Sequence, residues 1–447
     1  METPQEDQNT GFFHSNTAKM IMVGLLTLVL LIPLELVKNL IMERSFRQKE
    51  VIAETGEKWG ESVYFYGPIV KVPYKTYTET VLVNDKNEKT TQKKASVEYA
   101  YFFPETLQNR SDVKTKVLNR SNYESVVFSS DMKFEGSYTK PDFSSKNIPD
   151  TDILWDKATI LIRTTNLKSI RDEVKINLGG ANYTFEPVYS TEKDSVEALE
   201  TGFVNATVFQ SGAKVPFRFN MVYNGSQQIK MVPIGKTTTA KIESNWASPK
   251  FDGNFLPDDK SKSISEKGFS ADWKVLHINR AFSQQSFGVL PDLKPYAFGV
   301  DFIIPVNQYQ QNERAAKYGF LVIGLTFLIF FLIQSISKIK IHIFQYTMIG
   351  LALIMFYTLL ISITEHSSFM KAYLISGISV VLMIALYSIS ILKNRKFPAF
   401  IGTSLAVLYS FIYVIIQLEN YALLFGSIGL FLILGAVMYF SRKIDWN

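Results

Sequence analysis

The chain has 447 residues, of which 47% are hydrophobic and 20% are charged, and its net charge is +6. Lysine and arginine are mixed with acids in the polar part of the chain, and elsewhere they lie between hydrophobic stretches. Membrane topology therefore accounts for the positive charge, and no nucleic-acid partner is predicted. Cysteine is absent, which excludes disulfides, thiolate metal sites and a cysteine nucleophile. The last third is almost free of charge, so a soluble part and a lipid-embedded part are predicted in one polypeptide.

The first hydrophobic stretch follows a polar tail, residues 1–17. Residues 20–34 are apolar apart from Thr27, and residues 18–41 are long enough to cross about 30 Å of hydrocarbon as a helix. A cleaved signal peptide is the alternative, because Lys19 precedes the apolar run. No small-x-small cleavage site follows that run, so an uncleaved transmembrane anchor is favoured.

The next region, residues 42–312, is predicted to be a β-rich domain. From about Trp59 to Val306 the sequence forms short segments of period two, separated by Gly, Asn, Asp and Pro. One hairpin is predicted around Gly179-Gly180, with alternating apolar residues on both sides. A second turn is predicted at Asn224-Gly225, after the apolar face of Phe217, Phe219, Met221 and Tyr223.

No βαβ rhythm accompanies these strands, so the predicted fold is a mainly antiparallel sandwich or two packed β lobes. Residues 258–267 are predicted to form an exposed loop, and residues 86–94 a solvated hairpin tip. The order of the strands cannot be read from the sequence.

Five further hydrophobic stretches predict a C-terminal bundle of transmembrane helices within residues 318–440, followed by a tail, residues 441–447. Each stretch is close to the roughly 20 residues that a spanning helix needs. The loops between them are short, so consecutive helices are expected to be antiparallel. The predicted spans are 318–336, 344–364, 372–392, 397–416 and 421–440.

Basic residues in the short loops predict the orientation of these helices. Lys338 and Lys340, residues 393–396 and Arg442-Lys443 mark alternate ends, against Lys371 alone on the other side. Because positive loops stay in the cytoplasm, both termini are predicted to be cytoplasmic and the β domain to be periplasmic. The positive charges that follow the first helix oppose this assignment, but the charge rule is weak beside a long translocated domain.

Several segments in a fixed order resemble the CreD family of bacterial inner-membrane proteins over nearly the whole chain. In the N-terminal part they are Leu31-Ile32-Pro33, Glu43-Arg44, Trp59-Gly60, Gly67-Pro68 and Val72-Pro73. In the β domain they are "MVPIG" from Met231, Trp246 with Pro249, Phe251 and Gly253, and "GFSADW" from Gly268. Towards the C-terminus they are "FGVDFIIPVNQY" from Phe298, "RAAKYGFLVIGLTFLIFF" from Arg314, "QYTMIGLALIMFYTLLISITEH" from Gln345, "ENYALLFGS" from Glu419 and "IDWN" at the end.

The resemblance implies a Gram-negative inner-membrane protein of cell envelope integrity, tied to envelope stress and in some bacteria to a two-component system. It implies no catalytic residues. The four histidines are scattered, and no phosphate-binding loop, HExxH or GxSxG motif is present. No catalytic, cofactor or metal site is therefore predicted.

Charged residues near the ends of the predicted helices give one candidate site. Acids in a membrane protein are functional candidates by default, although helix-end acids are also cheaply solvated among lipid headgroups. The acids are expected to bridge the bundle to basic residues at the base of the β domain. This candidate interface between the domain and the bundle comprises Glu35, Arg314, Lys317, Glu365 and Glu419.

The leading hypothesis is a non-enzymatic envelope protein whose periplasmic β domain binds or senses an envelope component, with the bilayer and periplasmic or membrane proteins as partners. A transporter or lipid-handling protein is the alternative. It would call for polar or broken helices at the bilayer midplane, where these helices are apolar. A membrane enzyme ranks third, because no convergent acids, histidines or serines can be assembled at one depth.

Overall fold

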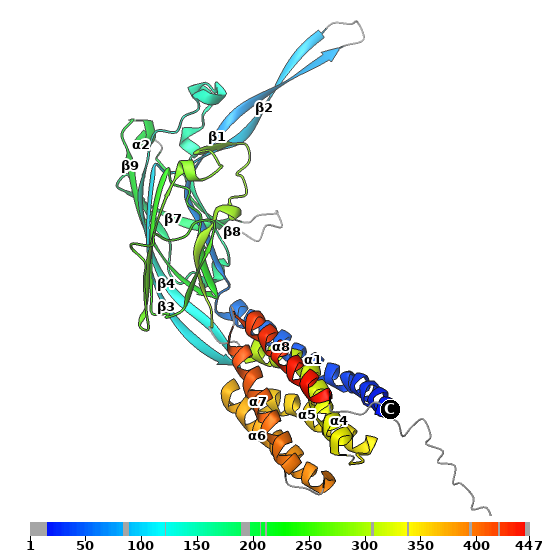
Figure 1. The fold of residues 1–447 in the computed structure, drawn as a ribbon. Helices are drawn as coiled ribbons and strands as arrows, with labels where there is room; N and C mark the ends of the chain where they lie inside the picture. The colour runs from blue at the N-terminus through cyan, green and yellow to red at the C-terminus, as the bar shows by residue number, and fades with distance from the viewer. Residues whose placement is uncertain are drawn as a thin grey trace, which may run out of the picture. The chain divides into compact units, whose positions relative to one another are not determined.

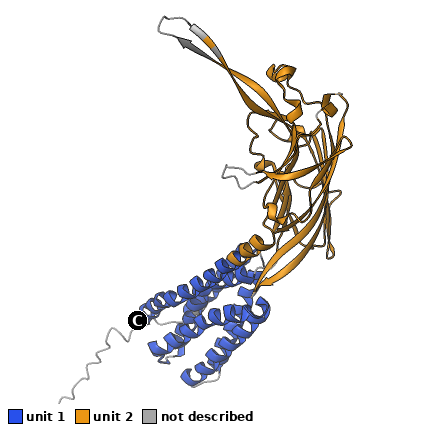
Figure 2. Cartoon of the chain, turned by 180° about the vertical axis from the view of Figure 1, so that it is seen from behind, with its two compact units in different colours: residues 1–49, 306–447 blue, residues 50–305 orange. Residues whose placement is uncertain are grey.

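The structure, a computed structural model, divides the chain into two compact units, which are described separately (Figure 2). One unit comprises residues 1–49 and 306–447, and the other comprises residues 50–305. The structure describes residues 16–83, 89–120, 122–188, 197–205, 207–210, 212–304, 308–337, 339–392, 396–418 and 421–442.

The first unit is helical, and in the described residues six helices are long and apolar enough to cross a membrane. Helix α1 is continuous from Asn16 to Trp59, with Pro33 inside it, so residues 42–59, which the sequence analysis grouped with the β domain, are helical. The hydrophobic stretches predicted as C-terminal spans are helical in the described residues, and α6 begins at Phe369 rather than at residue 372. The C-terminal helices are α3 (Gln308–Lys317), α4 (Gly319–Ser337), α5 (Ile343–Thr364), α6 (Phe369–Leu392), α7 (Lys396–Gln417) and α8 (Ala422–Ser441) (Figure 1).

The apolar part of α1 packs against this C-terminal bundle. Leu30, Leu34 and Ile41 are each at most 3% exposed, and their spacing places them on one face of a helix. Leu34 lies against Gly319 of α4, and Leu30 lies against Gly350 of α5. The first span is therefore an integral member of the helical unit.

The second unit is a β domain whose described strands are all connected through two sheets. Strand β7 pairs with β8 in the first sheet and with β6 in the second, and so joins them. The first sheet contains β1 (Val63–Val83), β2 (Lys89–Phe102), β5 (Thr159–Thr164), β7 (Ala181–Val188), β8 (Glu197–Thr201), β10 (Gln228–Met231), β12 (Pro249–Gly253), β15 (Gln285–Phe287) and β16 (Phe298–Phe302). The second contains β3 (Thr106–Arg120), β4 (Tyr123–Tyr138), β6 (Lys175–Leu178), β9 (Val215–Ser226), β11 (Thr237–Ser244), β13 (Ser263–Ser265) and β14 (Gly268–Leu276), and the short helix α2 (Thr207–Gln210) precedes β9.

The prediction of a mainly antiparallel domain is confirmed. Strand β1 pairs with β10 in parallel, as does β3 with β11. The other described strand pairs are antiparallel. Strands β1 and β2 form a long ribbon (Figure 1), with paired residues out to Val83 and Lys89.

Aromatic side chains from the two sheets meet between them and form the core. The rings of Phe65 on β1 and Phe134 on β4 are 4.6 Å apart. Trp273 on β14 and Phe298 on β16 are 5.5 Å apart. Ring pairs at these separations add roughly 0.5–1.5 kcal/mol each beyond the burial of their area. Because facing sheets share this core, the arrangement is sandwich-like, as predicted.

Of the two predicted turns, one is confirmed and one is wrong. Strands β6 and β7 form the hairpin at Gly179-Gly180, and both glycines have positive φ angles. The Asn224-Gly225 turn does not exist, because β9 continues through both residues to Ser226. A Cβ atom at Gly225 would lie 2.4 Å from the Phe128 ring, so this glycine permits a close approach between neighbouring strands rather than a turn.

The two predicted loops have different outcomes. Residues 258–267 are mostly exposed, as predicted, although Ser263–Ser265 forms the short edge strand β13. Within residues 86–94, the structure describes β2 from Lys89 onward, and the remaining residues of the predicted tip lie outside the described part of the chain.

Candidate functional site

Three of the residues in the candidate domain–bundle interface have partners on their own or a neighbouring helix. Glu35 on α1 pairs with Lys38 at 3.1 Å. On α3, Lys317 pairs with Glu313 at 3.1 Å. Arg314 Nη1 donates a hydrogen bond to the carbonyl oxygen of Ile416 on α7, at 3.4 Å.

Glu365, at the C-terminal end of α5, pairs with a residue that the sequence analysis did not include. Its Oε1 lies 3.4 Å from Nε of Arg44 on α1. The Glu365 side chain is 22% exposed and that of Arg44 is 44% exposed, so the pair is partly screened by solvent. Glu419 lies outside the described residues. The structure therefore joins Glu365 to α1, through a segment just beyond the apolar span.

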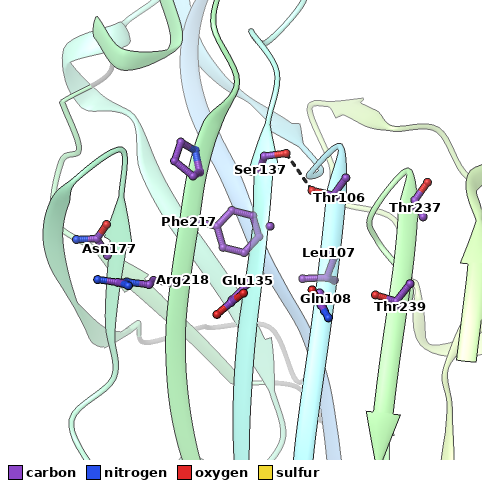
Figure 3. A pocket seen from close by; sticks show the side chains of 12 residues that line it. Thr106, Leu107, Gln108, Glu135, Ser137, Asn177, Phe217, Arg218, Thr237 and Thr239 are labelled. Atoms are coloured by element: carbon purple, nitrogen blue, oxygen red, sulfur yellow. Dashed lines mark hydrogen bonds between the residues drawn. The ribbon is translucent and has the colours of Figure 1, made fainter. Parts of the chain in front are cut away.

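The β domain carries a concavity that the sequence analysis did not predict (Figure 3). It has a volume of about 680 Å³ and lies on the outer face of the second sheet, within the size range of roughly 300–1,000 Å³ that ligand pockets occupy. It is lined by Thr106, Leu107, Gln108, Glu135, Gly136, Ser137, Asn177, Pro216, Phe217, Arg218, Thr237 and Thr239.

The polar side chains of this concavity come from five adjacent strands and lie in register. Asn177 on β6 is opposite Arg218 on β9, and Arg218 is opposite Glu135 on β4. Glu135 is opposite Gln108 on β3, which is opposite Thr239 on β11. Figure 3 shows these five side chains in a row across the strands. We call this set the polar row.

Glu135 and Arg218 are the charged members of the polar row, and both are exposed. In the part of the chain that the structure describes, neither forms an ion pair. The neighbouring Glu105, by contrast, pairs with Lys236 at 3.0 Å, and Lys241 pairs with Glu243 at 2.8 Å. The hydrogen bond from Lys241 lowers the pKa of the Glu243 carboxyl. Glu135 and Arg218 are thus available to a ligand, whereas adjacent acids are already paired.

The edge of the concavity is held by a hydrogen bond between hydroxyl groups. Thr106 Oγ1 and Ser137 Oγ are 2.9 Å apart, on the paired strands β3 and β4 (Figure 3). Below them, Phe217 is 3% exposed, so a buried aromatic ring supports the polar rim. Amide, hydroxyl, carboxylate and guanidinium groups around an apolar floor can hydrogen-bond a polar ligand and orient it.

The polar row carries no motif that a sequence search would detect. Its members come from segments up to about 130 residues apart, and only the register of non-consecutive strands brings them together. The one sequence signal is alternation, because exposed polar residues follow every second position on β3. Among the described residues, no group of three or more His, Asp or Glu could hold a metal ion.

Comparisons with known proteins agree with the resemblance seen in the sequence. The family described as "Inner membrane protein CreD" matches residues 15–447 of this chain. The inner membrane protein CreD of Escherichia coli (strain K12) is 27% identical over 423 residues, which cover 94% of this chain and 91% of that protein.

Proposed function

This chain belongs to the CreD family of inner membrane proteins, and we propose that its β domain faces the periplasm and binds or senses an envelope component. The protein would thereby support envelope integrity under stress without catalysing a reaction. The observation that carries this proposal is the polar row, which presents an exposed carboxylate and an exposed guanidinium beside amide and hydroxyl groups. Peptidoglycan fragments offer complementary hydroxyl, amide and carboxylate groups, so they are the ligand class that we favour.

We expect the purified full-length protein to bind soluble muropeptides, and Arg218→Glu to weaken binding at least 10-fold, or about 1.4 kcal/mol. The physical reason is that the substitution removes a donor and repels carboxylates. Lys133→Glu is the matched control, because Lys133 is exposed on the same face of β4 but does not line the concavity. Microscale thermophoresis measures both. Equal affinities in the two variants and the wild type would count against the concavity as the binding site.

The same variants are expected to differ in their ability to support growth of cells under envelope stress. In a strain that lacks the gene, the wild type and Lys133→Glu are expected to restore growth under envelope stress, and Arg218→Glu is not. Immunoblotting of membrane fractions checks that all three proteins accumulate equally. Full restoration by Arg218→Glu would mean that the polar row does not serve envelope integrity.

The proposed orientation rests on the basic residues between the C-terminal helices. Since the chain has no cysteine, a single introduced cysteine reports its own location. Lys260→Cys, in the exposed loop of the β domain, is expected to react with a membrane-impermeant thiol reagent in intact spheroplasts. Asn394→Cys, between Lys393 and Arg395, is expected to react only after lysis. The reverse pattern would overturn the proposed topology.

We also propose that the predicted interface residues Glu35, Arg314, Lys317, Glu365 and Glu419 link the bundle to the function of the β domain, with Arg44 as a further member. Glu365→Lys is expected to impair envelope-stress tolerance while leaving membrane insertion intact, since it places a cation beside Arg44. The exchange Arg44→Glu with Glu365→Arg is expected to restore tolerance. The effect on stability is small, about 0–1 kcal/mol, because the pair is partly exposed. Wild-type tolerance in Glu365→Lys would remove this role.

A further inference from the structure

The helical unit contains an apolar groove that no part of the proposed function uses. It lies among α4, α7 and α8 and has a volume of about 860 Å³. Its walls include Leu325 and Leu332 of α4, Phe400 and Val407 of α7, and Leu432 of α8. Phe400 and Val407 are 53% and 64% exposed, respectively, so the groove opens to the surroundings of the helices, which in a membrane are lipid.

The groove has a direction. Ser337 is the last residue of α4, Lys396 is the first of α7, and Val437 is near the end of α8. All three line the groove, so one end of the groove lies at the C-terminal ends of α4 and α8 and at the N-terminal end of α7. From Ser337 back to Leu325, α4 rises about 18 Å. This length is close to one leaflet of a hydrocarbon core of about 30 Å.

The end of the groove is cationic. Lys396 lines the groove and is exposed, and Lys340, which follows α4, is exposed as well. Arg442 follows α8, and its guanidinium carbon lies 4.2 Å from the Tyr439 ring centroid. Long basic side chains at a helix end extend towards the headgroups and attract anionic lipids.

We propose that this groove binds the acyl chains of one anionic glycerophospholipid, with the lipid phosphate at Lys396. The apolar walls match the chains, the length matches one leaflet, and the charge of Lys396 matches the phosphate. Gly429 on the wall of the groove already faces Phe411 of α7, whose ring would lie 2.0 Å from a Cβ atom at that position. The close approach that a glycine gives to a neighbouring helix is therefore made within this chain.

Native mass spectrometry of the purified full-length protein can test the proposal by titration with phosphatidylglycerol and phosphatidylethanolamine of identical chains. The wild type is expected to retain one phosphatidylglycerol and to bind it about 10-fold more tightly than phosphatidylethanolamine. Lys396→Glu is expected to lose this preference. Val407→Trp is expected to weaken the binding of both lipids at least 10-fold, because the indole ring fills the groove. Leu332→Trp, on the opposite wall, provides an independent second filling variant.

Two control variants make the outcomes decisive. Leu382→Trp places the same bulk on an exposed face of α6, and Lys371→Glu reverses a charge at the start of α6; both should bind as the wild type does. The proposal fails if Val407→Trp and Leu332→Trp bind as Leu382→Trp does. The assignment of the phosphate fails if Lys396→Glu keeps the preference. Unchanged lipid binding with a dimer that Val407→Trp dissociates would instead identify a second copy as the occupant. Muropeptide binding is measured separately, so failure here leaves the proposed function unaffected.

Discussion

Replacing Gly350 by leucine is expected to lower the free energy of unfolding of the helical unit by about 3 kcal/mol. The midpoint of thermal unfolding should therefore fall by roughly 6–12 °C. A Cβ atom at this position of α5 would lie 2.2 Å from Leu30 Cδ1 on α1 and 2.9 Å from Phe327 Cζ on α4. Neither side chain can retreat easily, because Leu30 is 3% exposed and Phe327 is 1% exposed. The substitution should therefore push α1 away from the bundle.

The measurement is the fraction of full-length protein that remains monodisperse by size-exclusion chromatography after heating in detergent. Gly324→Leu is the matched control, because nothing lies within 4 Å of a Cβ atom at Gly324 on α4. It is expected to shift the midpoint by no more than a few degrees. The double variant Gly350→Ala with Leu30→Ala should be more stable than Gly350→Leu, since the shortened side chain makes room. Equal midpoints for Gly350→Leu and Gly324→Leu would show that α1 does not need this contact.

The spans of the helical unit could be predicted because each depends on local composition alone. About twenty apolar residues with charged ends specify a spanning helix wherever it packs. The contact of Gly350 with Leu30 could not be predicted, because nothing in either segment specifies the other as its neighbour. Other glycines of the bundle make no such close contact: a Cβ atom would come to 3.4 Å from the nearest atom at Gly402 and to 3.9 Å at Gly426.

The β domain shows the same division between local and long-range information. The Gly179-Gly180 hairpin was predictable, because the turn and both strands lie within a few residues of one another. The prediction of an Asn224-Gly225 turn was wrong, because Gly225 is required for the close approach of Phe128, a residue on another strand. The polar row was missed for a related reason. Arg218 and Glu135 face each other only because β9 pairs with β4 in one register, and strand register is set by the whole sheet.

Loss of the Arg280 side chain is expected to lower the free energy of unfolding of the β domain by about 3 kcal/mol. Arg280 is 7% exposed. Its Nη1 donates to the carbonyl oxygen of Phe282 at 3.0 Å, and its Nη2 donates to those of Ile234 at 3.0 Å and Gly235 at 3.3 Å. Nη2 also donates to Gln284 Oε1 at 2.5 Å. Ile234 and Gly235 belong to the "MVPIG" segment, so this side chain holds one of the segments that carry the family resemblance.

Burial lowers the pKa of Arg280 to about 10, and its guanidinium still carries a proton at neutral pH. Arg280→Ala should leave the carbonyl oxygen of Phe282 and Gln284 Oε1 without this donor, at a cost of about 1–3 kcal/mol for each group left unsatisfied. Gln284 Nε2 and Thr238 Oγ1 still donate to the carbonyl oxygens of Ile234 and Gly235. The midpoint of thermal unfolding of the β domain should fall by roughly 6–12 °C. Four of the five tryptophans, Trp59, Trp155, Trp246 and Trp273, belong to this domain, so tryptophan fluorescence of the full-length protein reports its unfolding.

Two comparison variants separate the hydrogen bonds of Arg280 from its charge. Arg280→Lys keeps the positive charge but cannot donate in several directions at once, so we expect most of the loss to persist. Arg110→Ala removes an exposed arginine of β3 and should change stability by no more than about 0.5 kcal/mol. If Arg280→Ala unfolded at the same temperature as Arg110→Ala, the buried guanidinium would contribute nothing net, and its desolvation would cancel all of its hydrogen bonds.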